Sequence, residues 1–300
     1  MATFEHWLHK IATLRVDRAR GDPAPHKPLL LLVVFDLAEN GLLRGNALAL
    51  SPELAFRFCN YWSVVAHRRT QRPDVRLPFH HLQSDGFWSA LDDAGQPSAH
   101  RSLTRFAEIP SDFLRFAQDP ASRDKARRLI LATYFRPSER LALAETLGLP
   151  VKEKGQVEVG GTYQTVEDAK CAGREARFRV MVVSAYDFTC ALCGQRLTTI
   201  SAGSIVDAAH IHPFSDSRNN DPRNGIALCK NAHWLFDHGL WTVSDDYRVV
   251  VAVGTFSESS PDGPLLEQYH GRSLRLPRDE SLWPGPIYLS WHRKHRFQAC

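Results

Sequence analysis

The sequence has no long apolar run and few cysteines. Its longest uninterrupted apolar stretch, Leu29–Phe35, is far shorter than the roughly 20 residues that cross a bilayer. No apolar segment followed by a small-residue cleavage site lies near Met1, so the pattern does not predict a signal peptide. Six cysteines in 300 residues are too few for a disulfide scaffold. We therefore expect a cytoplasmic protein with reduced thiols.

The excess of positive charge is small and lies in one half of the chain. The formal net charge is +4, and residues 1–150 hold 20 Lys and Arg against 16 Asp and Glu, whereas residues 151–300 hold 17 of each. Basic surfaces attract phosphate, so the first half is the better candidate for a nucleic-acid contact. The apolar fraction of 43% and the charged fraction of 23% are normal for a globular protein of two domains.

The pattern of apolar residues predicts an α+β protein of two domains, of which the first is mainly helical with short strands. The segment 151–172 is polar and contains glycine, which is typical of a linker. It separates a domain over 1–150 from one over 173–300. Helices are predicted at 4–14, at 29–37 with Asn40-Gly41 as its end, at 52–65, at 122–134 and at 138–147. A basic loop is predicted over 66–76, and two short strands around the turn Ser84-Asp85-Gly86.

The second half carries a set of residues suited to phosphodiester hydrolysis. His210, Asn224 and His233 follow one another at intervals of 14 and 9 residues. Hydrolysis needs a base that deprotonates water, and imidazole titrates near neutral pH, which suits His210. It also needs a cation that neutralises charge on the phosphate. His233 and Asp237 are spaced i, i+4, so on a helix both side chains point the same way and are able to share a metal ion.

This constellation resembles the HNH nuclease family, which is built on a ββα-metal finger, over residues 175–300. The resemblance implies a strand that ends in His210 as the base and a second strand that carries Asn224, which bonds across the loop and holds the backbone of His210 in place. It also implies a helix that supplies His233. Many HNH proteins place a metal-binding His or Asp directly before the base, where this chain has Ala209. Asp207 is the nearest carboxylate and is our candidate third ligand. We expect Mg²⁺ or Mn²⁺ at a site of this kind.

Three cysteines lie around the same segment. Cys190 and Cys193 form a Cys-x-x-Cys pair, and Cys229 follows Asn224. Related proteins often bind a structural zinc through two such pairs, but Ala232 takes the fourth place here. Because structural zinc requires four ligands, we favour small buried thiols and keep a zinc site as the alternative.

The first half resembles the sulfur-binding domain that precedes HNH nucleases in type IV, McrA-like restriction enzymes. The motifs that carry this resemblance are His26–Leu32, Leu77–Trp88, Tyr134–Arg140 and Leu147–Leu149. Proteins of that kind bind phosphorothioated DNA, in which sulfur replaces a non-bridging oxygen. Sulfur is softer and less well hydrated than oxygen, so an apolar pocket beside a cation favours it. The candidate contacts are His80, His81, Tyr134, Phe135, Arg136 and Pro137, with Arg68, Arg69 and Arg72 in the basic loop.

Together these patterns predict a modification-dependent restriction endonuclease that recognises phosphorothioated double-stranded DNA and cuts it nearby. Cutting both strands needs two active sites or one used twice, so a homodimer is our working hypothesis. One alternative keeps the nuclease and lets the first half recognise methylated or unmodified DNA. A second is a DNA-binding protein with an inactive HNH site, which Ala209 keeps open. A zinc-organised interaction protein is the third.

Overall fold

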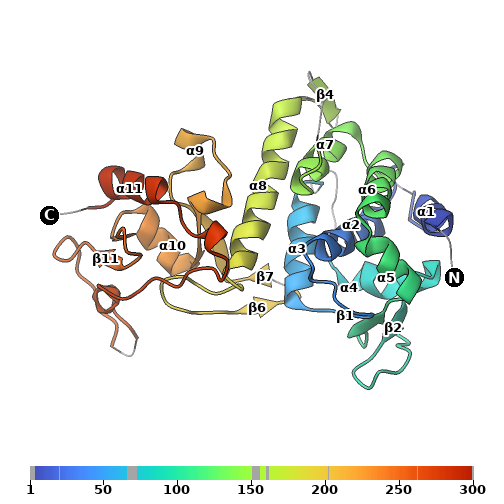
Figure 1. The fold of residues 1–300 in the computed structure, drawn as a ribbon, viewed down its shortest axis with the longest axis horizontal. Helices are drawn as coiled ribbons and strands as arrows, with labels where there is room; N and C mark the ends of the chain where they lie inside the picture. Colours follow the sequence, from blue (N-terminus) through green and yellow to red (C-terminus); the bar gives the residue numbers. More distant parts are fainter. Residues whose placement is uncertain are drawn as a thin grey trace. The chain divides into compact units, whose positions relative to one another are not determined.

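A computed structural model describes residues 4–19, 21–65, 73–150, 156–159, 162–201, 203–261 and 263–298. It shows an α+β chain that divides into two compact units. Unit 1 comprises Met1–Arg177 with Thr199–Gly203, and unit 2 comprises Phe178–Thr198 with Ser204–Cys300 (Figure 1). Within the described residues, no helix is both long enough and apolar enough to span a membrane.

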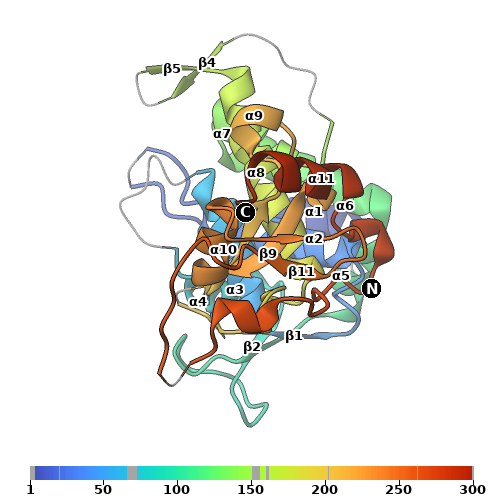
Figure 2. The ribbon, with the colours of Figure 1, turned by 90° about the vertical axis from the view of Figure 1, so that its left-hand side faces the viewer.

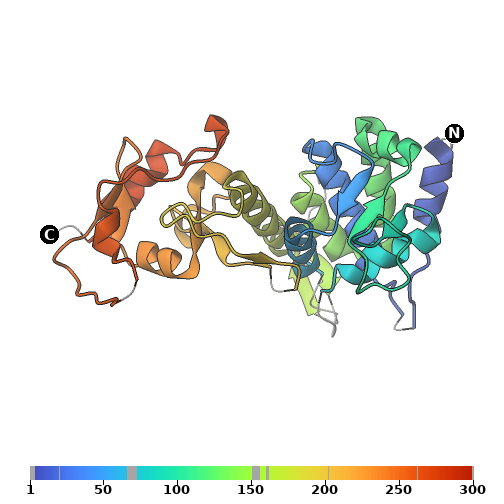
Figure 3. The ribbon, with the colours of Figure 1, turned by 90° about the horizontal axis from the view of Figure 1, so that it is seen from below.

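Unit 1 is a helical body with one small sheet. Its helices are α1 (Phe4–Ala12), α2 (His26–Glu39), α3 (Pro52–Ser63), α4 (Arg76–His81), α5 (Ser111–Gln118), α6 (Pro120–Tyr134) and α7 (Pro137–Thr146). The strands β1 (Ala47–Ala49), β2 (Ser89–Leu91) and β3 (Phe106–Glu108) form an antiparallel sheet in the order β1-β3-β2. Helix α1 packs against α5 and α6, as Figure 3 shows at the N-terminal end of the chain.

Helix α2 is the centre of the core of unit 1. All seven residues of Leu29–Phe35 are fully buried, as the dense apolar run predicted for a buried helix. Helices α3, α4, α5 and α6 all pack against α2. The helix ends at the predicted place, because Asn40 caps it and Gly41 adopts a positive φ of 67° that continues the chain in another direction.

The segment after Val75 corrects one prediction. Instead of a strand before the turn at Gly86, the chain forms helix α4 and a 3₁₀ turn η2 (Leu82–Asp85), and the strand starts only at Ser89. Phe79 and Leu82 are three residues apart and both fully buried, which is the spacing of a helical face. The contact of this face with α2 therefore outweighs the strand tendency of the local sequence.

The region predicted as a linker contains regular structure. Strands β4 (Gln156–Val159) and β5 (Thr162–Thr165) form an antiparallel hairpin, and helix α8 (Val166–Ala185) follows directly. Helix α8 thus begins inside the segment 151–172, and the division between the units falls within this helix. Arg68, Arg69 and Arg72 lie outside the described residues.

Unit 2 is built from short elements around an antiparallel hairpin. The hairpin pairs β8 (Val206–His210) with β9 (Gly225–Cys229), and helix α10 (Lys230–Asp237) follows it. The other elements are β6 (Thr198–Thr199), β7 (Gly203–Ser204), α9 (Phe214–Ser217), η3 (Pro222–Asn224), β10 (Trp241–Val243), β11 (Val249–Val251), η4 (Leu266–Tyr269), η5 (Glu280–Leu282) and α11 (Pro286–His295). Figure 2 shows α9, α10 and α11 of this unit from the side.

A partly buried ion pair in unit 1 generates a stability prediction. Arg127 is only 2% exposed and its Nη2 lies 2.8 Å from Oε2 of Glu39, whose side chain is 43% exposed. Burial by itself raises the pKa of Glu39, but the hydrogen bond and the positive charges of Arg127, Arg123 and Arg177 lower it overall. Because the folded pKa is lowered, the ion pair stabilises the fold above the ordinary pKa of a Glu carboxyl. This contribution is lost as the pH falls through the folded pKa.

We therefore expect Glu39→Gln to lower the free energy of unfolding at pH 7 by about 1–2 kcal/mol, a value discounted for the exposure of the carboxylate. Urea unfolding at pH 7 and at pH 3 measures the effect, which should shrink at the lower pH. Asp124→Asn, which breaks the exposed pair with Arg128, is the matched control and should change stability little. An equal loss for Glu39→Gln at both pH values would contradict the assignment.

Candidate active site

The hairpin and α10 carry the predicted nuclease residues, and His210 and Asn224 stand at the two ends of one loop. In the β8–β9 register His210 stands opposite Gly225, so the strands are joined by the loop 211–224, which carries α9 and η3. Helix α10 begins directly after Cys229 and packs on both strands. The order of strand, loop, strand and helix agrees with the ββα arrangement that the sequence predicted.

His210 is the last residue of β8, and its imidazole is held on two sides. Its ring stacks on the ring of Phe178 from α8, with centroids 4.0 Å apart and planes 10° from parallel. Its Nε2 lies 2.9 Å from Oδ1 of Asn220. These two contacts fix the orientation of a half-buried imidazole.

Asn224 is fully buried and bonds across the loop. Its Oδ1 accepts a hydrogen bond from the backbone N–H of His212 (2.8 Å), and its Nδ2 donates to the carbonyls of His212 (2.9 Å) and Asn219 (3.2 Å). The carbonyl of Asn224 also accepts a hydrogen bond from the N–H of Ile211. We predicted that Asn224 holds the backbone of the base itself. In the structure its side chain holds the backbone two residues after the base.

His233 and Asp237 lie together on α10, as their spacing predicted. Nε2 of His233 is 3.4 Å from Oδ2 of Asp237, which is close enough for both atoms to bind one cation. Both side chains are partly exposed, so water or phosphate oxygens have room to complete the coordination. These two residues therefore fit a divalent metal ion.

Asp207, the predicted third ligand, does not join this pair. Its carboxylate pairs with the ammonium group of Lys230 at the start of α10. It also lies three positions before His210 on β8, and side chains three apart on a strand leave opposite faces. Among the described residues, the one group of three or more His, Cys, Asp or Glu ligand atoms that gathers within 4.8 Å is made of cysteines.

That group consists of Cys190, Cys193 and Cys229. Their Sγ atoms all lie within 4.8 Å of one another, and those of Cys193 and Cys229 are 3.8 Å apart. Hydrogen bonds from Cys193 and Cys229 lower the pKa of Cys190, although burial opposes this shift. The chain thus concentrates thiols at a position that favours one thiolate, and no fourth ligand of the four residue types joins them in the described part of the chain.

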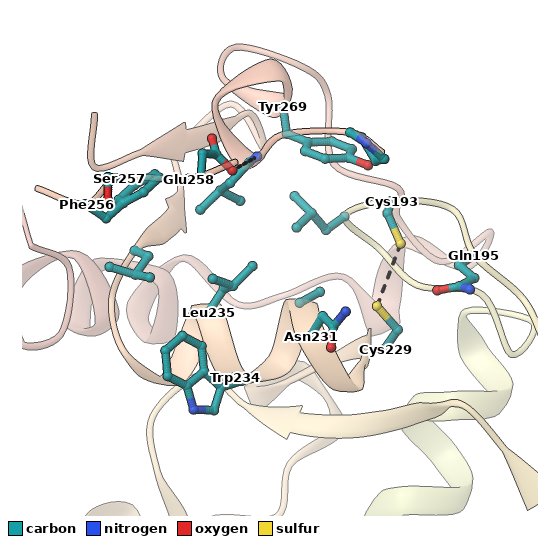
Figure 4. Close-up of a pocket in the computed structure, with 15 residues that line it drawn as sticks. Cys193, Gln195, Cys229, Asn231, Trp234, Leu235, Phe256, Ser257, Glu258 and Tyr269 are labelled. Carbon is teal, nitrogen blue, oxygen red and sulfur yellow. Dashed lines mark hydrogen bonds between the residues drawn. The ribbon is translucent and has the colours of Figure 1, made fainter. Parts of the chain in front are cut away.

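A pocket of about 490 Å³ borders the thiol cluster (Figure 4). Cys193 and Cys229 lie at one edge of it and Tyr269 above them, while Leu235 and Trp234 of α10 form part of the wall. Trp234 is 57% exposed, which is unusual for so large an apolar side chain.

The predicted sulfur-contact residues around Tyr134 are mostly part of the interior of unit 1. Tyr134 is 1% exposed; its hydroxyl donates to the carbonyl of Ile11 (2.7 Å) and accepts from the N–H of Leu14 (3.1 Å). Phe135 is also buried. Because packing between α1 and α6 encloses these two rings, they do not line an exposed pocket, contrary to our expectation.

The remaining two residues of that motif also have local roles. Nε of Arg136 donates to Oδ1 of Asp22 at 3.2 Å, and its Nη2 contacts the second oxygen of the same carboxylate. Pro137 is the first residue of α7, a position where proline is well tolerated. Arg136 is only half-buried, so its guanidinium still reaches the surface.

His80 and His81 occupy the end of α4 and differ in exposure. His80 is buried, with Nδ1 2.8 Å from the hydroxyl of Thr104, whereas His81 is exposed. Burial lowers the pKa of His81, and the positive charges of Lys27, Arg101 and His100 lower it further. His81 is therefore an exposed ring in a positive electrostatic environment, in which Lys27 is itself paired with Asp85.

Sequence reasoning missed the residues that come from other segments. Phe178 and Asn220 hold His210, and Lys27, His100 and Arg101 surround His81. None of them stands at a fixed spacing from the residue that it supports. Asn220 had one signal, since it belongs to the polar loop between the predicted base and Asn224.

Comparison with known proteins agrees with this geometry for part of the chain. Residues 190–244 match the family described as HNH endonuclease, a segment that contains His210, Asn224, His233 and all three clustered cysteines. No curated protein matches the chain.

Several solved structures are similar to the chain at a low level. The "Modification dependent TagI restriction endonuclease" is 22% identical with a TM-score of 0.32, over 40% of this chain and 37% of that one. The "Sulfur binding domain of SprMcrA complexed with phosphorothioated DNA" is 21% identical with a TM-score of 0.41, over 49% of this chain and 95% of that one. The "Type IV phosphorothioation-dependent restriction endonuclease ScoMcrA" is 13% identical with a TM-score of 0.32, over 78% of this chain and 94% of that one.

The family match and the ββα geometry coincide on the same residues. The solved structures have TM-scores below 0.5 and therefore do not strengthen this conclusion. Residues 190–244 thus match the HNH endonuclease family and carry the ββα order of elements, which supports a nuclease function for this part of the chain.

Proposed function

We propose that the chain is a modification-dependent restriction endonuclease, which recognises phosphorothioated DNA with residues 1–150 and cuts it with residues 173–300. One observation carries the nuclease half. His210 is held by Phe178 and Asn220 at the mouth of a loop that Asn224 closes. A fixed orientation of this kind suits a general base, which has to reach the proton of the attacking water.

The chain's own residues divide the work as follows. His210 takes a proton from the water that attacks phosphorus, and Asn224 keeps the loop after the base in one conformation. His233 and Asp237 hold a divalent cation, Mg²⁺ or Mn²⁺. When bound, that ion neutralises charge on the phosphate and on the leaving oxygen. Asp207 takes no part in this scheme, because Lys230 occupies it.

The proposal for DNA recognition by residues 1–150 centres on His81. Its imidazole is exposed at the end of α4, with His80 packed edge-on at 5.0 Å and with cationic neighbours. A weakly hydrated sulfur on a phosphate gains from contact with a ring, while the neighbouring cations match the phosphate charge. Arg136 remains a candidate contact, and Arg68, Arg69 and Arg72 stay predictions from the sequence.

We also propose that the three thiols hold a zinc ion with one position left to an external ligand, although the sequence favoured simple burial. Zinc binds thiolates at about 2.3 Å in a tetrahedron, which separates neighbouring sulfurs by about 3.8 Å. The separation of Cys193 and Cys229 is 3.8 Å. Water or an external ligand would take the fourth position, which Ala232 leaves without a side-chain donor.

Cleavage of two matched duplexes, one phosphorothioated and one not, tests the function. In Mg²⁺ or Mn²⁺ we expect cutting of the sulfur-bearing duplex only, with no cutting in EDTA. His210→Ala should reduce the rate at least about 100-fold, the usual contribution of a general base. His295→Ala, which removes an exposed histidine of α11, is the control and should cut normally.

The other outcomes decide between the alternatives. Equal cutting of both duplexes would keep the nuclease and discard sulfur recognition. Binding without cutting in either metal would favour a DNA-binding protein with an inactive site.

DNA binding by the non-cutting His210→Ala protein tests the recognition of phosphorothioated DNA by residues 1–150. We expect His81→Ala to reduce the preference for phosphorothioated over unmodified duplex about 10-fold, because it removes the ring beside the sulfur. The pKa of His81 is lowered, so the imidazole is neutral at pH 7 and gains its charge only in acid. Affinity for DNA should therefore rise as the pH falls from 7 to 5.5, and this rise should be smaller in His81→Ala. His9→Ala on α1 serves as the control, and an unchanged preference in His81→Ala would exclude this histidine.

Metal analysis of the purified chain tests the thiol cluster. We expect about one zinc per chain, a lower zinc content in Cys193→Ser, and a lower melting temperature because the ion joins the turn at Cys190 to β9. Cys59→Ser, outside the cluster, should leave zinc unchanged. If the wild-type protein contains no zinc after purification without a chelator, the three cysteines are thiols without a metal role.

A further inference from the structure

Arg218, in the loop between the HNH strands, has a backbone conformation that its residue type disfavours. It ends α9 with φ 50° and ψ 30°, in the left-handed region. Its N–H donates to the carbonyl of Phe214, which closes the short helix. Residues other than glycine pay roughly 1 kcal/mol for this conformation. Glycine would adopt this conformation without the steric cost, so the backbone alone does not explain an arginine at position 218.

The guanidinium of Arg218 is connected to the base through one ring. Its central carbon lies 5.6 Å from the centroid of Phe214, and the Phe214 ring lies 5.9 Å from the ring of His210. Phe214 thus contacts the base on one side and supports the cation on the other. A guanidinium on an aromatic face is held in position while its N–H groups remain available.

Within the described part of the chain, no carboxylate pairs with the guanidinium of Arg218. Arg218 is exposed and forms no ion pair among the described residues. The nearby carboxylate of Asp216 accepts a hydrogen bond from Ser215 and lies 4.0 Å from Nη2 of Arg296. Lys230, another cation close to the hairpin, is neutralised by Asp207. Arg218 is therefore an exposed cation over the ring of Phe214, which in turn contacts His210, and it forms no ion pair among the described residues.

We infer that Arg218 binds a phosphate of the DNA strand that His210 attacks, and so positions that strand at the active site. The guanidinium fork matches two oxygens of a phosphate, which a point charge does not. Phe178 contacts one face of the His210 ring and Asn220 contacts its Nε2, while Phe214 links His210 to the exposed Arg218. This inference rests on the proposed function, because it assumes a DNA substrate.

Replacement by glycine separates function from folding at this position. Arg218→Gly removes the guanidinium and relieves the backbone, so its melting temperature should equal or exceed that of the wild type. Its kcat/KM for duplex cleavage should fall about 10- to 100-fold, mainly through a higher KM. Arg218→Lys should recover only part of this loss, since it keeps the charge without the fork. Arg272→Ala is the matched control, because Arg272 also lies over an aromatic ring, Tyr269, in the same unit.

A binding measurement distinguishes failure of this inference from failure of the proposed function. In His210→Ala protein, affinity for the duplex is measured at several salt concentrations. Adding Arg218→Gly should weaken binding and reduce the slope of log affinity against log salt by about 0.9, the value for one phosphate contact. An unchanged slope, or full cleavage by Arg218→Gly, would overturn the inference while leaving the nuclease intact. If neither the wild type nor Arg218→Gly cleaves the duplex, but the salt slope still falls, the proposed cleavage activity is wrong and the phosphate contact of Arg218 is supported.

Discussion

The side-chain amide of Asn224 is the constraint on which the nuclease site depends. It is fully buried, and both its oxygen and its nitrogen form hydrogen bonds with backbone groups of the loop. A buried amide without partners costs on the order of 1–3 kcal/mol, so the loop and the amide stabilise one another. The loop after His210 would otherwise have many conformations, and the base, Phe214 and Arg218 would lose their fixed relation. The hydrogen bonds of one residue therefore set the geometry of a whole segment.

A close approach between α8 and the hairpin complements this constraint. Gly225 stands opposite His210, and a Cβ atom on it would lie 2.5 Å from Val182 and 2.8 Å from Phe178. The absence of a side chain therefore allows α8 to lie against the strands, which brings the Phe178 ring onto His210. His210 is thus positioned by packing on one face of its ring and by a polar contact at its edge.

The thiol cluster and the active site share the same hairpin. Cys229 ends β9 and caps α10, so the helix that carries His233 and Asp237 begins at a cysteine of the cluster. The contact between Cys193 and Cys229, whose Sγ atoms are 3.8 Å apart, therefore lies at the start of this helix. In unit 1 the corresponding support is apolar, since the buried helix α2 holds α4 and its two histidines.

The sequence by itself determined the relations that lie within one element. The i, i+4 spacing placed His233 and Asp237 together on a helix, and the apolar run at Leu29 predicted a buried helix, because periodicity depends only on local geometry. Only the tertiary structure decided contacts between distant segments. It brought Phe178 to His210 and Lys230 to Asp207, gathered three thiols, and enclosed Tyr134 in the core. Such contacts depend on how elements pack, and the spacing of residues along the chain carries no information about them.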